Sequence, residues 1–220
     1  MIKYKALLFG SIGTLVETSD IQRKAFNEAF KQKNLNWNWT KKIYKELLKK
    51  SGGEDRISNY ALQKKISVNE KKLRELKTKI FNNYLKNNQL YPRPGVKEII
   101  KYCKKKHINL GLVSSTTQNN INSIFFCLRK SIDIKDFDFV GNSKLAKKPK
   151  PFPDIYKFAL KKLKLKASEC IAIEDSQESL NSAKKANIKC FVFPGKFHSS
   201  KKFKGAEKII QKITKDIIEK

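Results

Sequence analysis

The residues best suited to chemistry fall in four short clusters of the sequence. Three hydroxyl residues at 114–116 follow one apolar run, and a carboxylate pair at 174–175 follows another. A turn that begins at Gly10 follows a third run, and a lysine- and proline-rich stretch covers 147–153. Hydroxyls, backbone amides and a lysine suit the oxygens of a phosphate, and adjacent carboxylates suit Mg²⁺. The clusters together predict a phosphate site with a possible magnesium site beside it.

Each cluster taken alone also has an ordinary structural explanation. Ser114 could cap a helix, and Lys148 or Lys150 could be a solvated surface charge. Glu174 and Asp175 could be an acidic pair that is stabilised by a helix dipole. Four such clusters at the ends of apolar runs are harder to explain separately, so their arrangement favours a ligand site.

Five short apolar runs predict the strands that position these clusters. The runs are apolar on both faces, as in strands that helices cover on both sides, and they lie at 5–9, 108–113, 137–140, 170–173 and 189–193. Amphipathic segments predict helices at 95–106, 119–130, 154–165 and 176–187. The alternation predicts an α/β fold with an open, mostly parallel sheet flanked by helices. Such sheets bind ligands beyond the carboxyl ends of their strands.

The end of the chain also carries a helical pattern. Ile209, Ile210, Ile213 and Ile217 recur at helical spacing. We therefore predict a last helix at 206–220 that packs on the core.

One region interrupts the alternation of strand and helix. Between about 20 and 90 there is no convincing strand, and three segments read as amphipathic helices. The economical arrangement is an all-helical cap at 17–91, inserted into an α/β core of 1–16 and 92–220. The stretch YPRPG at 91–95 is the predicted return hinge.

The charge of the chain is strongly positive. Lys and Arg number 49 against 20 Asp and Glu, which gives a formal net charge of +29. The basic residues are nearly all lysine and are scattered along every segment, whereas nucleic-acid surfaces favour arginine and stacking aromatics. We predict only nonspecific nucleic-acid binding, which salt would weaken.

The remaining composition points to a cytoplasmic protein. No apolar run approaches the ~20 residues of a membrane span, and the amino-terminal apolar stretch is too short for a signal peptide. The four cysteines form no CxxC pair, and there are only two histidines, which argues against a zinc site. The cysteines are expected to be buried and reduced.

Nearly the whole chain resembles the haloacid dehalogenase superfamily of phosphatases and phosphomutases, in the group with a helical cap. LLFGSIGTLVET (7–18) resembles the first motif, usually LLFDxDGTLxDT, and Ser114 stands where the second motif has Ser or Thr. KPFPDIY (150–156) resembles the third motif, and this makes Lys150 the motif lysine. IEDSQESLNSAKKA (173–186) resembles the fourth. The resemblance implies a Rossmann-like core and a phosphate that contacts Thr14, Ser114, Ser115 and Lys150.

The cap resembles that of the xylulose-bisphosphate phosphatases of the Calvin cycle. The segments that carry this resemblance are NEAFKQKNLNWNW and KKSGGEDRI. It implies a loop at 51–57, including Gly53, that faces the substrate, with Arg56 holding a distal phosphate.

The first motif departs from the family pattern at its two aspartates. The family's nucleophile and general acid/base stand at the positions that hold Gly10 and Ile12 here. Glycine has no nucleophile and isoleucine carries no proton. Ser11 is expected to face away from the site by strand alternation, and Thr14 lacks an adjacent base. Family-type turnover should therefore be negligible, and a Mg²⁺ site at Glu174 and Asp175 should be weakened.

Three hypotheses follow. The first is a pseudoenzyme that binds a phosphorylated small molecule, such as a sugar phosphate, and that senses a metabolite or regulates a protein partner. The second is an active phosphohydrolase in which Glu174 and Asp175 hold a metal-activated water. The third is a lysine-driven binder of nucleic acid or of another anionic surface.

Overall fold

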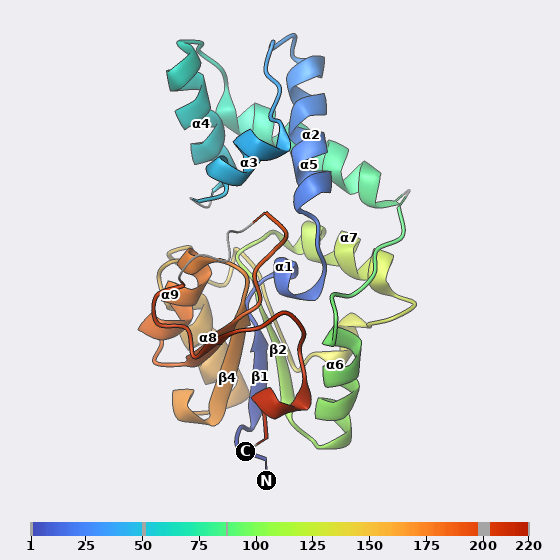
Figure 1. Cartoon of the computed structure of the whole chain (residues 1–220), viewed down its shortest axis with the longest axis vertical. Coiled ribbons are helices and arrows are strands. Elements are labelled where there is room, and N and C mark those ends of the chain that lie inside the picture. The colour runs from blue at the N-terminus through green and yellow to red at the C-terminus, as the bar shows by residue number, and fades with distance from the viewer. Residues whose placement is uncertain (1, 50–51, 87, 198–202, 220) are drawn as a thin grey trace. The chain divides into compact units, whose positions relative to one another are not determined.

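The computed structural model describes residues 2–49, 52–86, 88–197 and 203–219 (Figure 1). The chain divides into two compact units. One comprises Met1–Glu17 and Gln89–Lys220, and the other comprises Thr18–Asn88. We call the first the core unit and the second the cap unit, and each is described by itself.

A parallel sheet forms the centre of the core unit. In the described residues it has six strands in the order β3-β2-β1-β4-β5-β6, and every pairing is parallel. The strands are β1 (Ala6–Phe9), β2 (Asn109–Val113), β3 (Phe139–Gly141), β4 (Cys170–Glu174), β5 (Lys189–Val192) and β6 (Lys208–Ile209). β1 and β4 are buried at every position, as their uninterrupted apolar sequences require for strands covered on both faces.

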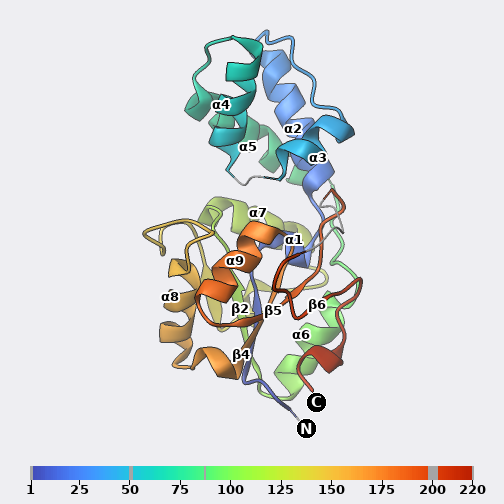
Figure 2. The ribbon, with the colours of Figure 1, turned by 60° about the vertical axis from the view of Figure 1, so that its left-hand side comes forward.

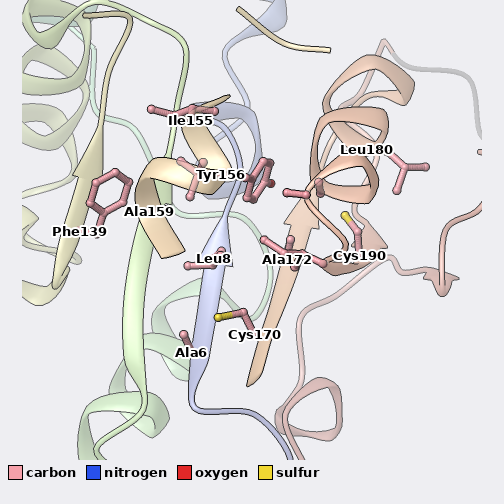
Figure 3. Close-up of a cluster of buried hydrophobic side chains, with 14 of the residues drawn as sticks. Ala6, Leu8, Phe139, Ile155, Tyr156, Ala159, Cys170, Ala172, Leu180 and Cys190 are labelled. Atoms are coloured by element: carbon pink, nitrogen blue, oxygen red, sulfur yellow. The ribbon is translucent and has the colours of Figure 1, made fainter. Parts of the chain in front are cut away.

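Helices cover both faces of this sheet (Figures 1 and 2). α8 (Asp154–Leu163) and α9 (Gln177–Lys185) lie on one face, and α6 (Val96–Lys105) and α7 (Gln118–Leu128) lie on the other. Buried side chains of β1, β4, α8 and α9 fill the space under the first pair, as Figure 3 shows for Leu8, Ala172, Ala159 and Leu180. The predicted α/β class, with a parallel sheet between helices, is confirmed.

The remaining short elements of the core unit are single turns. α1 (Ile12–Leu15) follows β1, and three 3₁₀ turns are η1 (Ile134–Asp136), η2 (Ala167–Glu169) and η3 (Lys215–Ile217). The four cysteines are free, and three of them are buried. Burial raises the pKa of the Cys103 thiol to about 12, so this cysteine is a packing residue.

The regular elements in the described part of the cap unit are all helices. Its helices are α2 (Ser19–Gln32), α3 (Lys41–Leu47), α4 (Gly53–Lys64) and α5 (Glu70–Lys86). An aromatic cluster packs them together, with Phe26, Phe30 and Trp39 in mutual ring contact. No helix in the described part of the chain is long and apolar enough to span a bilayer.

The prediction of a final helix at 206–220 is wrong. Lys208–Ile209 instead extends the sheet as β6, and η3 is a single 3₁₀ turn. The backbone N–H of Ile210 donates to the Val192 carbonyl at 2.8 Å, and that of Ile213 donates to the Pro94 carbonyl at 3.1 Å. The isoleucine pattern does mark burial of Ile213 and Ile217, but the backbone hydrogen bonds of this segment go to the sheet edge and the hinge.

The prediction of a loop at 51–57 is also wrong in its described part. Gly53–Ile57 forms the start of α4, and Ser51 lies outside the described residues. Gly52 precedes the helix with a φ of +91°, a conformation that glycine adopts without strain. Glu54 and Asp55 then occupy the first turn, where the helix dipole favours negative charge.

Candidate functional site

The parallel register brings the ends of β1, β2 and β4 to one edge of the sheet. Phe9 pairs with Leu112 on one side and with Ile173 on the other. Gly10 follows the end of β1, Ser114 follows the end of β2, and Glu174 is the last residue of β4, so the three lie at the same edge of the sheet. Three of the four polar clusters meet at this edge, as the sequence predicts for the carboxyl ends of parallel strands.

Lys150 brings the fourth cluster to the same edge. Its ammonium donates to the Gly10 carbonyl and to Glu174 Oε1, each at 2.5 Å. Tyr156 of α8 also donates its hydroxyl proton to Glu174 Oε1, at 2.6 Å. All three side chains are buried, and Glu174 and Tyr156 have no exposed surface. The result is a desolvated Lys–Glu–Tyr cluster around the end of β1.

Glu174 occupies the space that a side chain at position 10 would need. A Cβ atom built on Gly10 would overlap the Cδ, Oε1 and Oε2 atoms of the Glu174 carboxyl group. Any residue larger than glycine at position 10 therefore displaces this carboxyl group from Lys150 and Tyr156. Gly10 and the position of the Glu174 carboxyl group are therefore linked, because glycine is the residue that leaves room for that group.

The Glu174 carboxyl group has a perturbed proton affinity. Burial raises its pKa above the ordinary value, the ammonium of Lys150 opposes this rise, and the negative charge of Asp175 adds to it. Burial beside the Glu174 charge likewise holds the pKa of Tyr156 well above its usual value. Glu174 Oε2 is buried and has no hydrogen-bond partner within the described protein atoms. The cluster thus contains one acceptor oxygen that is available to a proton, a ligand or a cation.

The second carboxylate lies against the same turn. A Cβ atom built on Gly13 would overlap Asp175 Oδ2 and would lie 3.6 Å from Ser11 Oγ. Ser11 Oγ is itself buried, and the described protein atoms offer it no hydrogen-bond partner. Asp175 and Ser11 therefore flank Gly13, whereas Glu174 flanks Gly10.

The predicted phosphate hydroxyls lie in three different surroundings. Ser114 is buried, and its Oγ accepts a hydrogen bond from the Thr116 backbone N–H at 3.2 Å. Ser115 is exposed. Thr14 is fully buried and donates its hydroxyl proton to the Ser11 carbonyl at 2.6 Å, so that proton is committed to the backbone.

Arg93 is a site residue that the sequence analysis missed. Its guanidinium donates to the carbonyls of Gly13 and Phe193, each at 2.8 Å, and to that of Pro194 at 2.5 Å. It also lies 3.4 Å from the centre of the Phe193 ring. Burial lowers the Arg93 pKa, which Glu17 and Asp175 partly oppose. The sequence signal for Arg93 is its place within YPRPG, a stretch that by itself predicts a hinge.

The two predicted cap residues lie within the cap unit. Arg56 Nε donates to the Leu47 carbonyl at 3.0 Å, and its guanidinium lies 5.7 Å from the centre of the Tyr44 ring. Gly53 is the first residue of α4, with the side chain of Arg74 nearby. Their roles toward a substrate stay predictions.

The side chains present fit a resident magnesium ion only in part. Among the described residues, no group of three or more His, Cys, Asp and Glu side chains is placed to hold a metal. Glu174 Oε1 is engaged by Lys150 and Tyr156, which leaves Oε2 and the Asp175 carboxylate as donors. Mg²⁺ is commonly held by one or two protein carboxylates together with water and substrate phosphate. The donor set is therefore at the lower limit for this ion.

A sheet of this topology with these four motifs at its edge is characteristic of one family. A family model for haloacid dehalogenase-like hydrolases matches residues 12–193, and the chain belongs to that family. The resemblance inferred from the motifs is thereby confirmed.

The relatives include CbbY proteins and a protein named as a phosphatase. The protein CbbY of Cereibacter sphaeroides is 30% identical over 209 residues, which cover 94% of this chain and 91% of CbbY. A phosphorylated carbohydrates phosphatase of Thermotoga maritima is 28% identical over 190 residues, which cover 84% of this chain and 82% of that protein.

Solved structures of CbbY from Rhodobacter sphaeroides are similar over the whole fold. Its complex with phosphate has a TM-score of 0.85 at 29% identity, covering 96% of this chain and 95% of the CbbY chain. A mutant of that CbbY in complex with xylulose-(1,5)bisphosphate gives the same TM-score, identity and coverage.

Proposed function

We propose that this protein binds a phosphorylated small molecule, of the sugar-phosphate class, and does not turn it over efficiently by the family's chemistry. The observation that carries the proposal is the overlap between the Glu174 carboxyl group and any side chain at position 10. Position 10 lacks a nucleophilic side chain, and the space for such a side chain is filled. The buried carboxyl group of Glu174, which is hydrogen-bonded to Lys150 and Tyr156, occupies it.

The loss of chemistry follows from the residue types. Gly10 offers no nucleophile and Ile12 offers no proton to a leaving group. Removing a nucleophile or its partner base costs about 10⁶-fold in kcat in a well-studied hydrolase. Ser11 Oγ is buried and Thr14 donates to the backbone, so neither hydroxyl is supplied with a base in the described structure.

The capacity to bind phosphate rests on what the site retains. Lys150, Ser114 and the backbone amides of the turn after β1 lie at one edge of the sheet. CbbY, which has a similar fold, has been solved in complex with phosphate and, as a mutant, with xylulose-(1,5)bisphosphate. The family pattern has two aspartates at positions 10 and 12, where this chain has Gly10 and Ile12. This edge is therefore less negative than the family pattern implies, and an anionic ligand depends less on a cation to offset negative charge. We therefore propose binding in which Mg²⁺, if it takes part through Glu174 and Asp175, is optional.

Titration calorimetry with sugar mono- and bisphosphates, with and without Mg²⁺, tests this proposal. We expect heat of binding in both conditions, no product release, and loss of binding in Ser114→Ala. Ser168→Ala is the matched control, because Ser168 is exposed and lies in η2, which precedes β4. Absence of binding to every phosphorylated ligand in both conditions contradicts the proposal.

Restoring the two aspartates tests the loss of chemistry directly. We expect Gly10→Asp with Ile12→Asp to recover phosphatase activity that depends on Mg²⁺. This recovery requires the Glu174 carboxyl group to move out of the space beside position 10. Adding Glu174→Asp to the pair shortens the obstructing side chain and should raise the recovered activity. A folded triple variant without activity would show that the remaining site has diverged as well.

The unpartnered Glu174 Oε2 supports a second candidate. Together with Asp175 it could hold a metal ion that activates a water molecule for phosphoester hydrolysis. Turnover that co-purifies with the protein and disappears in Asp175→Ala would favour this rerouted phosphohydrolase over the binding protein.

A further inference from the structure

The return hinge places one arginine against the turn that follows β1. The Arg93 backbone N–H donates to the Leu15 carbonyl at 2.8 Å, and its guanidinium donates to the Gly13 carbonyl, also at 2.8 Å. Both carbonyls belong to α1. The Gly13 carbonyl shares a peptide plane with the Thr14 N–H, and that N–H closes the turn onto the Ser11 carbonyl at 3.2 Å. The contact with Arg93 therefore sets the tilt of a peptide unit inside the turn.

The same guanidinium is fixed by the loop after β5. It donates to the carbonyls of Phe193 and Pro194, and it lies against the Phe193 ring. The Phe193 backbone N–H in turn donates to the Glu174 carbonyl at 2.7 Å, at the end of β4. Arg93 thus joins the turn after β1 to a loop that is itself bonded to the end of β4, at the edge of the sheet where we propose the phosphate site.

The planar shape of the guanidinium group is what matches this set of contacts. Nη1 donates to carbonyls of two separate segments, Gly13 and Phe193, while Nη2 donates to Pro194. These donors lie in one rigid plane, and the centre of that plane is 3.4 Å from the centre of an aromatic ring. An ammonium is a point charge without such a plane. Arg93→Lys therefore keeps the positive charge but loses the geometry.

The guanidinium also brings a positive charge to this edge of the sheet. Asp175 and Glu17 partly oppose the fall in the Arg93 pKa that burial causes, so both carboxylates lie within electrostatic range of it. The Asp175 carboxylate lies against Gly13 on the same turn. A fixed cation near Asp175 offsets part of its negative charge, which lowers the free energy of bringing an anionic ligand to this edge.

We propose that Arg93 is a positioning residue for the phosphorylated ligand. It holds the peptide unit between Gly13 and Thr14 in the orientation that the ligand meets, and its charge offsets that of Asp175. Its own guanidinium donates to protein carbonyls and acts on the ligand through the turn. This role rests on the proposed function, and it gives the loop after β5 a part in ligand affinity, because that loop fixes the guanidinium plane.

Calorimetry with inorganic phosphate and fructose bisphosphate tests this role, at a temperature where every variant is fully folded, so that a loss of stability alone leaves the Kd unchanged. We expect the Kd to rise about 10-fold or more in Arg93→Ala and in Arg93→Lys, because hydrogen bonds to a charged group are lost. Millimolar guanidinium chloride, but not sodium chloride, should restore part of the affinity of Arg93→Ala. It should restore none in Arg93→Lys, whose side chain fills the space.

Arg23→Ala is the matched control for these variants. The Arg23 guanidinium also donates to a backbone carbonyl, that of Trp39 at 3.0 Å, but it does so within the cap unit. Its loss should change the Kd by less than about 2-fold. A change as large as that in Arg93→Ala overturns the positioning role.

Amide hydrogen exchange of the ligand-free protein measures the positioning by itself. The Thr14 N–H should exchange at least about 10-fold faster in Arg93→Lys, while the amides of β4 keep their wild-type rates. If the wild type binds a ligand and Arg93→Lys binds it equally well, or if Thr14 exchange is unchanged, the positioning role is wrong and the proposed function stands. If the wild type binds neither ligand, the proposed function is wrong and the role falls with it.

Discussion

Two buried lysines, one in each unit, show two ways in which this protein removes an ammonium from water. Lys150 in the core unit meets a carboxylate, a backbone carbonyl and, through Glu174, a tyrosine hydroxyl. Lys77 in the cap unit meets one amide oxygen and two phenyl rings, with two guanidinium groups in range. The first is paired with a carboxylate, whereas burial and two guanidinium groups lower the pKa of the second to about 7. Two lysines that are equally buried therefore differ in the groups that surround their ammonium.

The largest effect should come from breaking the core pair. Lys150→Met leaves the Glu174 carboxyl group buried without its cation and should lower the free energy of unfolding by about 3–5 kcal/mol. Denaturant unfolding measures this loss. Lys148→Met, at an exposed lysine two residues away, should change the same free energy by less than about 0.5 kcal/mol.

The equivalent change in the cap should have the opposite sign. Lys77→Met removes a buried cation without a counter-charge, and we expect the free energy of unfolding at pH 6 to rise by about 1–3 kcal/mol. Below pH 7 the lysine is charged in both the folded and the unfolded state. The wild type therefore bears the full free-energy cost of burying this charge at such pH. Between pH 7 and about 10.4 the unfolded chain holds more protons than the folded one, so wild-type stability rises with pH.

The gain from Lys77→Met should therefore shrink as the pH rises from 7 toward 10. Thermal unfolding of the variant and the wild type across this range measures the trend. A gain that is constant with pH would show that Lys77 is not neutralised by folding and would break the contrast with Lys150.

A smaller effect concerns the glycine beside the core pair. Gly10→Ala should cost about 1–3 kcal/mol because its Cβ displaces the Glu174 carboxyl group. In a Glu174→Asp background the shorter side chain relieves the overlap, and the two substitutions should couple by about 1 kcal/mol. Chemical denaturation of the four proteins gives the coupling energy. If the free-energy changes of the two single variants simply add in the double variant, the Glu174 carboxyl group moves aside at no cost in free energy.

The smallest effect is the matched glycine substitution in the cap. Gly53→Ala adds a methyl group at the start of α4, where the nearest atoms belong to the flexible Arg74 side chain. We expect a stability gain of up to about 0.5–1 kcal/mol, since alanine favours a helix over glycine. A lower free energy of unfolding in the same denaturation experiment would contradict this expectation. It would show that the added methyl group meets a steric obstacle beside Gly53.

The sequence predicts the parts of this structure that local chemistry determines. Runs such as ALLF in β1 and CIAIE in β4 are apolar on both faces, and the strand and its burial follow from that alone. The meeting of Gly10, Ser114 and Glu174 follows from parallel register. The membership of the haloacid dehalogenase-like family follows from the motifs at these positions.

The features that sequence reasoning missed depend on distant partners. Glu174 turns toward Gly10 only because Lys150 and Tyr156 hold it there, and Arg93 is a site residue only because three carbonyls from separate segments surround it. The end of the chain has a helical pattern, but the free edge of β5 offers it a strand partner. These outcomes are decided by tertiary contacts, which a pattern in one segment does not contain.

The bridge between Val16 and Pro92 has a consequence for how the chain accommodates its insertion. These two residues pair across an isolated antiparallel bridge, and the Arg93 N–H donates to the Leu15 carbonyl at 2.8 Å. The chain therefore leaves the core unit and returns to it at neighbouring positions. The two ends of the inserted segment are joined there by backbone hydrogen bonding. For such a loop the entropy of closure changes by only about 0.6 kcal/mol when its length doubles. The segment between these residues can lengthen, shorten or be exchanged for another module at little cost to the stability of the sheet in the core unit.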